Sequence, residues 1–187
     1  MELSKAEKLI LAMLCDIHEH LKVQSDIDSK LVKSALWGDK TWGLTWEYSM
    51  LFGGSIEKPE GVSEVVDILD MWSAIESYYG RLSPEDQQLV KSEVRRFGGD
   101  LRFPGFDGND EVEGNYMSIS EFLVNDLHRF GSFRGRDFNS HHPFLDMYRG
   151  MVKAFSKVRP QIPDSPLSAA QIISIFKSGD NAEAVGK

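Results

Sequence analysis

Four arginines beside aromatic residues are the chemically most distinctive group in this 187-residue sequence. Arg129, Arg134 and Arg136 lie close in sequence to Phe130 and Phe133. The fourth, Arg149, lies on the next expected helix. An arginine fork matches the oxygens of a phosphate or carboxylate, and an aromatic ring can stack on a planar group. We therefore predict that these arginines bind an anionic small molecule or an acidic partner protein.

The charge of the chain is unevenly distributed along the sequence. The formal net charge is −8, but residues 128–159 carry +5, so the remainder carries −13. An acidic chain is not attracted to polyanions over its whole surface, which argues against nucleic acid as a partner and still permits a local anion site. The alternative interpretation of the basic segment is a solvated surface whose arginines pair with acids elsewhere in the fold.

Two carboxylates are expected to point inward. Glu76 and Asp126 each fall within the apolar arc of a predicted helix. A carboxylate in an apolar setting must find a partner or raise its pKa. If the two share a cleft, they would provide the acid and base of a hydrolase-like enzyme. Otherwise each is expected to form a structural ion pair with an arginine such as Arg81, Arg102 or Arg129.

A denser group of possible metal ligands surrounds the sequence His141-His142-Pro143. His142 and Asp146 are four residues apart at a helix start, and zinc accepts imidazole and carboxylate ligands. His141, His142 and Asp146 are therefore the candidate metal ligands of the hydrolase alternative. The simpler interpretation is that His141 or His142 caps the helix that begins at Pro143, and we expect no cofactor.

The single cysteine, Cys15, excludes an intrachain disulfide and favours a reducing, cytoplasmic location. Charged residues near the start of the chain do not resemble a secretory signal, and the apolar run 9–15 is too short to span a membrane. Cys15 lies with Leu11 and His18 on one side of the first predicted helix. This grouping indicates a reactive thiolate, a second packing face or a subunit contact.

Helical periodicity accounts for nearly all of the apolar residues. Expected helices cover about 4–23, 28–37, 41–52, 62–82, 83–97, 109–130, 143–158 and 168–178. On the first of these, six apolar residues fall within a sector of about 140° that is typical of a packed face; they are Leu9, Ile10, Met13, Leu14, Ile17 and Leu21. We predict an all-α fold, a single-domain orthogonal bundle of about eight helices over residues 1–178, followed by a flexible C-terminal tail over 179–187.

The chain has more apolar residues than one core requires. Leu11, Trp37, Trp42 and Trp46 indicate a second buried surface, so we expect a homo-oligomer.

Several ordered segments resemble the YfbU-like family of bacterial proteins. These segments are Glu7-Lys-Leu-Ile-Leu, Trp42-Gly-Leu, Val66-Asp-Ile-Leu-Asp-Met-Trp72, Phe103-Pro-Gly-Phe-Asp107, Pro143-Phe-Leu-Asp-Met-Tyr-Arg-Gly-Met151 and Leu167-Ser-Ala-Ala-Gln-Ile-Ile173. The resemblance implies no established activity, and some members resemble the partner of a DNA-binding helix-turn-helix module, which implies a ligand-sensing role.

The sequence therefore predicts a helical ligand- or partner-binding, regulatory domain that recognises an anionic group, and leans away from an enzyme. The alternative is a hydrolase-like enzyme that uses the inward carboxylates, with or without a metal ion.

Overall fold

The computed structural model describes residues 3–53, 59–94, 96, 101–159 and 166–185. In these ranges the chain forms eight α-helices, a π-helical turn and a 3-10 turn, with one isolated β-bridge between Phe106 and Asn139. The prediction of an all-α bundle is confirmed. The chain forms two compact units, a first unit of residues 1–60 with 122–129 and a second unit of residues 61–121 with 130–187. The single domain predicted over 1–178 stays a prediction.

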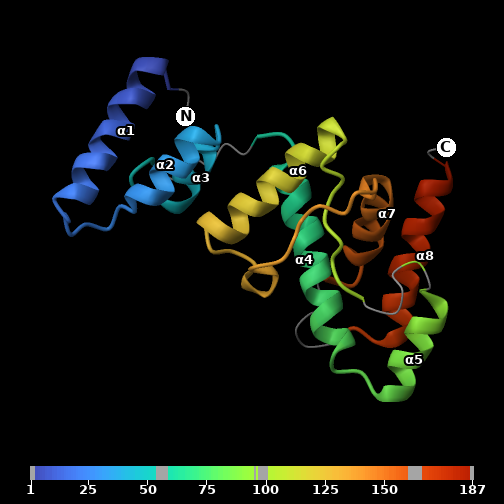
Figure 1. Cartoon of the computed structure of the whole chain (residues 1–187). Coiled ribbons are helices and arrows are strands. Elements are labelled where there is room, and N and C mark those ends of the chain that lie inside the picture. Colours follow the sequence, from blue (N-terminus) through green and yellow to red (C-terminus); the bar gives the residue numbers. More distant parts are fainter. Residues whose placement is uncertain (1–2, 54–58, 95, 97–100, 160–165, 186–187) are drawn as a thin grey trace. The chain divides into compact units, whose positions relative to one another are not determined.

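The first unit contains α1 (Lys5–His20), α2 (Ser29–Trp37), α3 (Thr41–Glu47) and the π-turn η2 (Phe122–Asp126). Local capping explains where its helices begin: Ser4 and Glu7 form a reciprocal capping box, and the Asp28 side chain accepts hydrogen bonds from two amides at the start of α2. Helices α1 and α2 pack side by side (Figure 1). These starts agree with the sequence.

Helix α1 buries the face opposite to the one that the sequence predicts. Its buried residues are Ala12 and Cys15, on the side that packs toward α2. The six residues of the predicted packed face are instead 51 to 66% exposed. The short side chains of Ala12 and Cys15 let α2 approach closely, whereas periodicity alone identifies only the larger apolar face.

Helix α3 ends at Glu47, earlier than the predicted Phe52. Its Trp42 is buried and meets Phe122 edge-on, with ring centroids 5.5 Å apart. Trp42 therefore packs inside the first unit rather than on a surplus surface, whereas Leu11 is partly buried. Trp37 is the tryptophan that remains mostly in solvent.

The second unit is built around α4 (Val62–Tyr79), which packs against α6 (Glu111–Glu121), α7 (Leu145–Phe155) and α8 (Ala169–Val185). Seven α4 residues are buried, as the wide apolar arc predicts. Helix α5 (Pro84–Glu93) begins at an Ser83 cap and packs against α8 (Figure 1). The 3-10 turn η3 (Gly131–Phe133) lies in the loop that precedes α7.

Helices α7 and α8 form the closest helix pair of the second unit. A Cβ atom on Gly150 would lie 2.6 Å from the Ala182 Cβ, and one on Gly179 would lie 2.9 Å from the Met147 backbone oxygen. The two glycines therefore permit a crossing that larger residues would exclude. Helix α8 continues through Val185, into the segment that the sequence assigns to a flexible tail.

Candidate functional site

Three of the four predicted anion-binding arginines form ion pairs within the chain. Arg129 lies 3.1 Å from the Glu47 carboxylate in the first unit. In the second unit Arg149 contacts Glu64 at 2.8 Å and Asp146 at 3.3 Å. These contacts match the alternative interpretation, in which basic residues pair with acids elsewhere in the fold.

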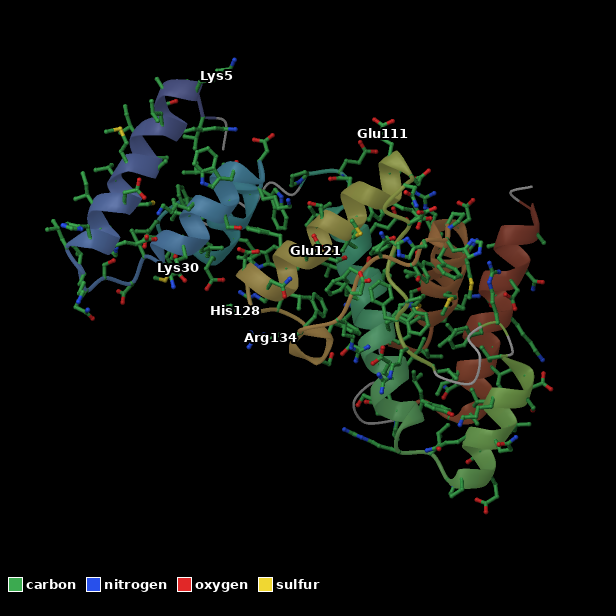
Figure 2. The ribbon with its side chains drawn as sticks, in the orientation of Figure 1. Lys5, Lys30, Glu111, Glu121, His128 and Arg134 are labelled. Atoms are coloured by element: carbon green, nitrogen blue, oxygen red, sulfur yellow. The ribbon has the colours of Figure 1, made fainter. Side chains whose placement is uncertain are left out.

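Arg136 forms a two-pronged pair with Glu76, with Nη1–Oε1 and Nη2–Oε2 distances of 2.7 Å. The guanidinium also lies 4.9 Å from the centroid of the Phe133 ring. Arg134 is exposed, as are Arg129 and Arg149, and lies on the turn after η3 (Figure 2). Within the second unit, Arg136 and Arg149 thus hold loops and helices together, whereas no ion pair is described for Arg134 among the described residues.

The two inward carboxylates of the hydrolase hypothesis belong to different units. Glu76 is on α4 and accepts a third hydrogen bond from the Phe103 amide at 2.7 Å, so both of its oxygens are occupied. Asp126 is half-buried at the end of η2 in the first unit. The expected structural ion pair of Glu76 is therefore present, with Arg136 rather than Arg81, Arg102 or Arg129.

The candidate metal ligands lie in the exposed loop before α7 and in the first turn of α7. His141 and His142 are exposed, and Asp146 bonds to Arg149. Among the residues that the structure describes, no group of three His, Cys, Asp or Glu side chains is placed to hold a metal ion.

The predicted histidine cap of α7 is wrong, because Glu113 caps this helix. Its Oε1 accepts the amides of Phe144 and Leu145 at 2.9 and 2.8 Å, while Oε2 accepts the Asp107 amide at 2.8 Å. The side chain reaches α7 from α6 and is 3% exposed. A carboxylate at a helix N-terminus complements the helix dipole, and here it also joins the loop at Asp107 to the bundle.

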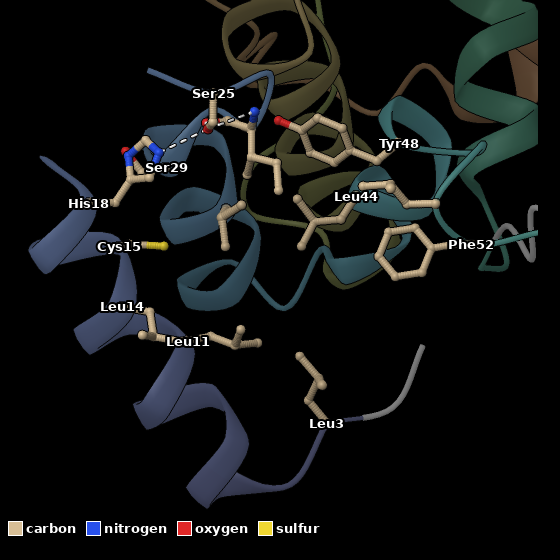
Figure 3. Close-up of a pocket in the computed structure, with 13 residues that line it drawn as sticks. Leu3, Leu11, Leu14, Cys15, His18, Ser25, Ser29, Leu44, Tyr48 and Phe52 are labelled. Atoms are coloured by element: carbon tan, nitrogen blue, oxygen red, sulfur yellow. Dashed lines mark hydrogen bonds between the residues drawn. The ribbon is translucent and has the colours of Figure 1, made fainter. Parts of the chain in front are cut away.

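An apolar pocket lies within the first unit (Figure 3). Its volume is about 480 Å³, in the range of small-molecule sites. Helix α1 contributes Leu11, Leu14, Cys15 and His18, and α2 and α3 contribute Ser29, Val32 and Leu44. None of the thirteen lining residues is Asp, Glu, Lys or Arg, so the cavity favours an uncharged occupant.

Polar groups gather toward one end of this pocket. His18 Nε2 lies 2.9 Å from Ser25 Oγ, and Tyr48 Oη accepts the Asp28 amide at 2.8 Å. Figure 3 shows these groups apart from Leu3 and the neighbouring leucines at the other end. None of the contacts described for Tyr48 uses its hydroxyl hydrogen, which can therefore be donated to an acceptor in the pocket.

Burial sets the protonation of Cys15 and Tyr48 in the pocket. Burial raises the pKa of the Cys15 thiol, an effect that outweighs the opposing charge of Lys33. Burial likewise raises the pKa of Tyr48, so both groups stay neutral at neutral pH. A neutral thiol does not provide the reactive thiolate that Cys15 and His18 suggested, and the second packing face is what the structure contains.

Sequence inspection missed this pocket because its lining comes from three helices and the segment 48–52. The signal that pointed toward it was the grouping of Leu11, Cys15 and His18 on one side of α1. Across the described ranges, the helices are too short or too polar to cross a bilayer.

Most of the chain is similar to known proteins. A family model described as the YfbU domain matches residues 1–177. The UPF0304 protein MJECS11 of Methanocaldococcus jannaschii is 32% identical over 159 residues, which cover 81% of this chain and 86% of that protein. Because this relative is archaeal, the resemblance extends beyond the bacterial proteins expected from the sequence. The chain belongs to the YfbU family.

Proposed function

We propose that this protein is a binding protein rather than an enzyme, and that its site is the apolar pocket of the first unit. The observation that supports this proposal is the uncharged cavity of about 480 Å³ between α1, α2 and α3. The predicted anion site is a weaker candidate, because Arg129, Arg136 and Arg149 are already paired with carboxylates. Recognition of a ligand would suit the regulatory role inferred from the family resemblance.

The pocket's chemistry defines the class of ligand. An elongated apolar body fits the leucine-lined part, and one neutral oxygen acceptor fits the end that carries Tyr48 and His18. A full charge would be unfavourable, because the lining offers no opposite charge to compensate for lost hydration. We therefore propose an uncharged, medium-length alkyl or acyl compound with a single polar head.

A hydrolytic role for Glu76 receives less support. Its oxygens accept hydrogen bonds from Arg136 and the Phe103 amide, so acid–base chemistry would require the rupture of that pair. We also place the protein in the cytoplasm, where a lone thiol such as Cys15 stays reduced.

Titration with the uncharged dye N-phenyl-1-naphthylamine tests the proposal. We expect saturable fluorescence enhancement with one dye per chain, and displacement by decanol more effectively than by decanoate or decyltrimethylammonium. Val32→Trp, which fills the pocket, is expected to abolish binding. The matched control Lys30→Trp places the same side chain on the exposed side of α2 and is expected to bind normally. Equal binding by both variants would contradict the pocket assignment.

A further inference from the structure

The first unit carries most of the exposed apolar surface. Of the fourteen large hydrophobic residues that are exposed in the described part of the chain, twelve lie in this unit, and the second unit contributes Leu89 and Val112. Monomeric proteins rarely expose contiguous apolar surface of this extent. The first unit therefore carries an exposed apolar surface of the kind that binds another molecule.

Helix α1 supplies the centre of this surface. Its exposed apolar residues recur over about 18 Å of helix, on the side opposite the buried Ala12 and Cys15; they are Leu9, Ile10, Met13, Leu14, Ile17 and Leu21. The same sector contains Ala6 and His20 and no Asp, Glu, Lys or Arg. An uncharged apolar stripe is matched best by another uncharged apolar stripe.

Neighbouring exposed residues widen the stripe on both sides. Trp37 shares one surface hollow with Leu9, and Ile27, Leu51 and Phe52 line the pocket together with Leu14. At roughly 100 Å² for a fully exposed side chain of this size, the exposed fractions of the six stripe residues and these four neighbours amount to roughly 580 Å². A stable interface buries roughly 800 Å² per partner, of which somewhat more than half is apolar, so one such face against its copy has the required extent.

The helix dipole of α1 favours an antiparallel pair. Side-chain charges add little to this preference. Glu7 lies beside Lys5 and Lys8 in the first turn. Asp16 and Glu19 are already paired with Lys33 of the same chain. Antiparallel helices place the dipole-positive end of one copy against the dipole-negative end of the other, whereas parallel helices would place like against like.

We propose that α1 pairs antiparallel with α1 of a second copy of this chain, about a two-fold axis near Met13 and Leu14. Ile10 of each copy then meets Ile17 of the other, and the ends of the stripe bring Ala6 against Leu21. A closed two-fold contact of this kind uses the same face twice and leaves no unpaired copy of it. The pairing does not require a ligand in the pocket, although Leu14, Ile27, Leu51 and Phe52 belong both to this face and to the pocket lining.

Sedimentation velocity over a concentration series tests the pairing with the full chain. We expect a dimer, and Ile17→Glu is expected to raise its dissociation constant at least about 100-fold, because a carboxylate then faces Ile10 in each of the two symmetry-related contacts. The matched control Leu89→Glu, on the second unit, is expected to remain a dimer. Circular dichroism and thermal melting of each variant show whether it is folded. A monomeric wild-type chain, or a folded Ile17→Glu variant that dimerises normally, would overturn the proposal.

Disulfide trapping in a Cys15→Ser background tests the orientation. Met13→Cys lies beside its own counterpart near the axis and is expected to cross-link on oxidation. Leu21→Cys lies against Ala6 of the other copy and is expected not to cross-link. Efficient cross-linking of Leu21→Cys without Met13→Cys would overturn the antiparallel arrangement.

Discussion

Arg136 donates two parallel hydrogen bonds of 2.7 Å to Glu76, which lies sixty residues earlier in the sequence. The pair is mostly buried, with the side chains 28% and 15% exposed, and Glu76 also receives the Phe103 amide. It therefore fastens both the loop before α6 and the loop before α7 to the central helix α4. An arginine that sequence analysis assigned to ligand recognition has a structural role here.

Replacing Glu76 by Gln is expected to lower the free energy of unfolding by about 2 kcal/mol, because a charged two-pronged contact becomes a single neutral one. Urea unfolding measures the change. The control Glu47→Gln removes the charge from the more exposed pair with Arg129 and should cost less than about 1 kcal/mol. Equal costs for the two variants would refute the distinction between them.

Glu113→Gln tests the carboxylate that caps α7. A glutamine side chain has one acceptor oxygen, so the amides of Asp107, Phe144 and Leu145 cannot all be satisfied. We expect a loss of about 2 kcal/mol in the free energy of unfolding. Glu111→Gln, an exposed change two residues away on α6, should have little effect. A harmless Glu113→Gln would show that the cap contributes nothing.

The same substitution at two helical glycines should have opposite effects. Gly179→Ala forces a Cβ to within 2.7 to 2.9 Å of Met147 and Met151 and should destabilise by about 1–3 kcal/mol. Gly114→Ala meets its nearest atom at 3.5 Å and should stabilise α6 by up to about 1 kcal/mol. Thermal melting compares them, and a shift of the same sign in both would contradict the packing described for α7 and α8.

Tyr116 gives the second unit an alkaline pH dependence. Burial and the hydrogen bond to Glu64 raise the pKa of Tyr116 from 10.0 to about 12. Because the unfolded chain releases this proton first, stability is complete below pH 10 and is lost as the pH rises toward about 12, by about 2 kcal/mol. Urea unfolding across this range should show a shallower decline for Tyr116→Phe. Parallel curves for the variant and the wild type would exclude Tyr116 as the source.

Local signals in the sequence predicted the helices well and their packing less well. The helices that Ser4, Asp28 and Ser83 cap begin where the sequence predicts, since capping depends on residues a few positions apart. The face that α1 buries depends on which helix meets it, and the small residues Ala12 and Cys15 decided that contact. Periodicity cannot distinguish a face that meets the chain's own core from one left in solvent.

The candidate site was predictable in part. A partner for Glu76 followed from the cost of burying a charge, but its identity as Arg136 depended on the folding of a long loop. The apolar pocket could not be predicted, because it forms where α1, α2 and α3 come together in space and no residue spacing in the sequence indicates that packing. Among its lining residues, the sequence indicated only that Leu11, Cys15 and His18 share one side of the first helix.

The modification rate of Cys15 tests the central claim most directly. This thiol is the only one in the chain, lines the pocket and is 7% exposed, so a disulfide reagent reaches it through the cavity. Decanol at saturation is expected to slow its reaction with dithiodipyridine at least about tenfold, as bound ligand blocks access and adds stability. An unchanged rate in the presence of decanol would contradict a ligand pocket in the first unit.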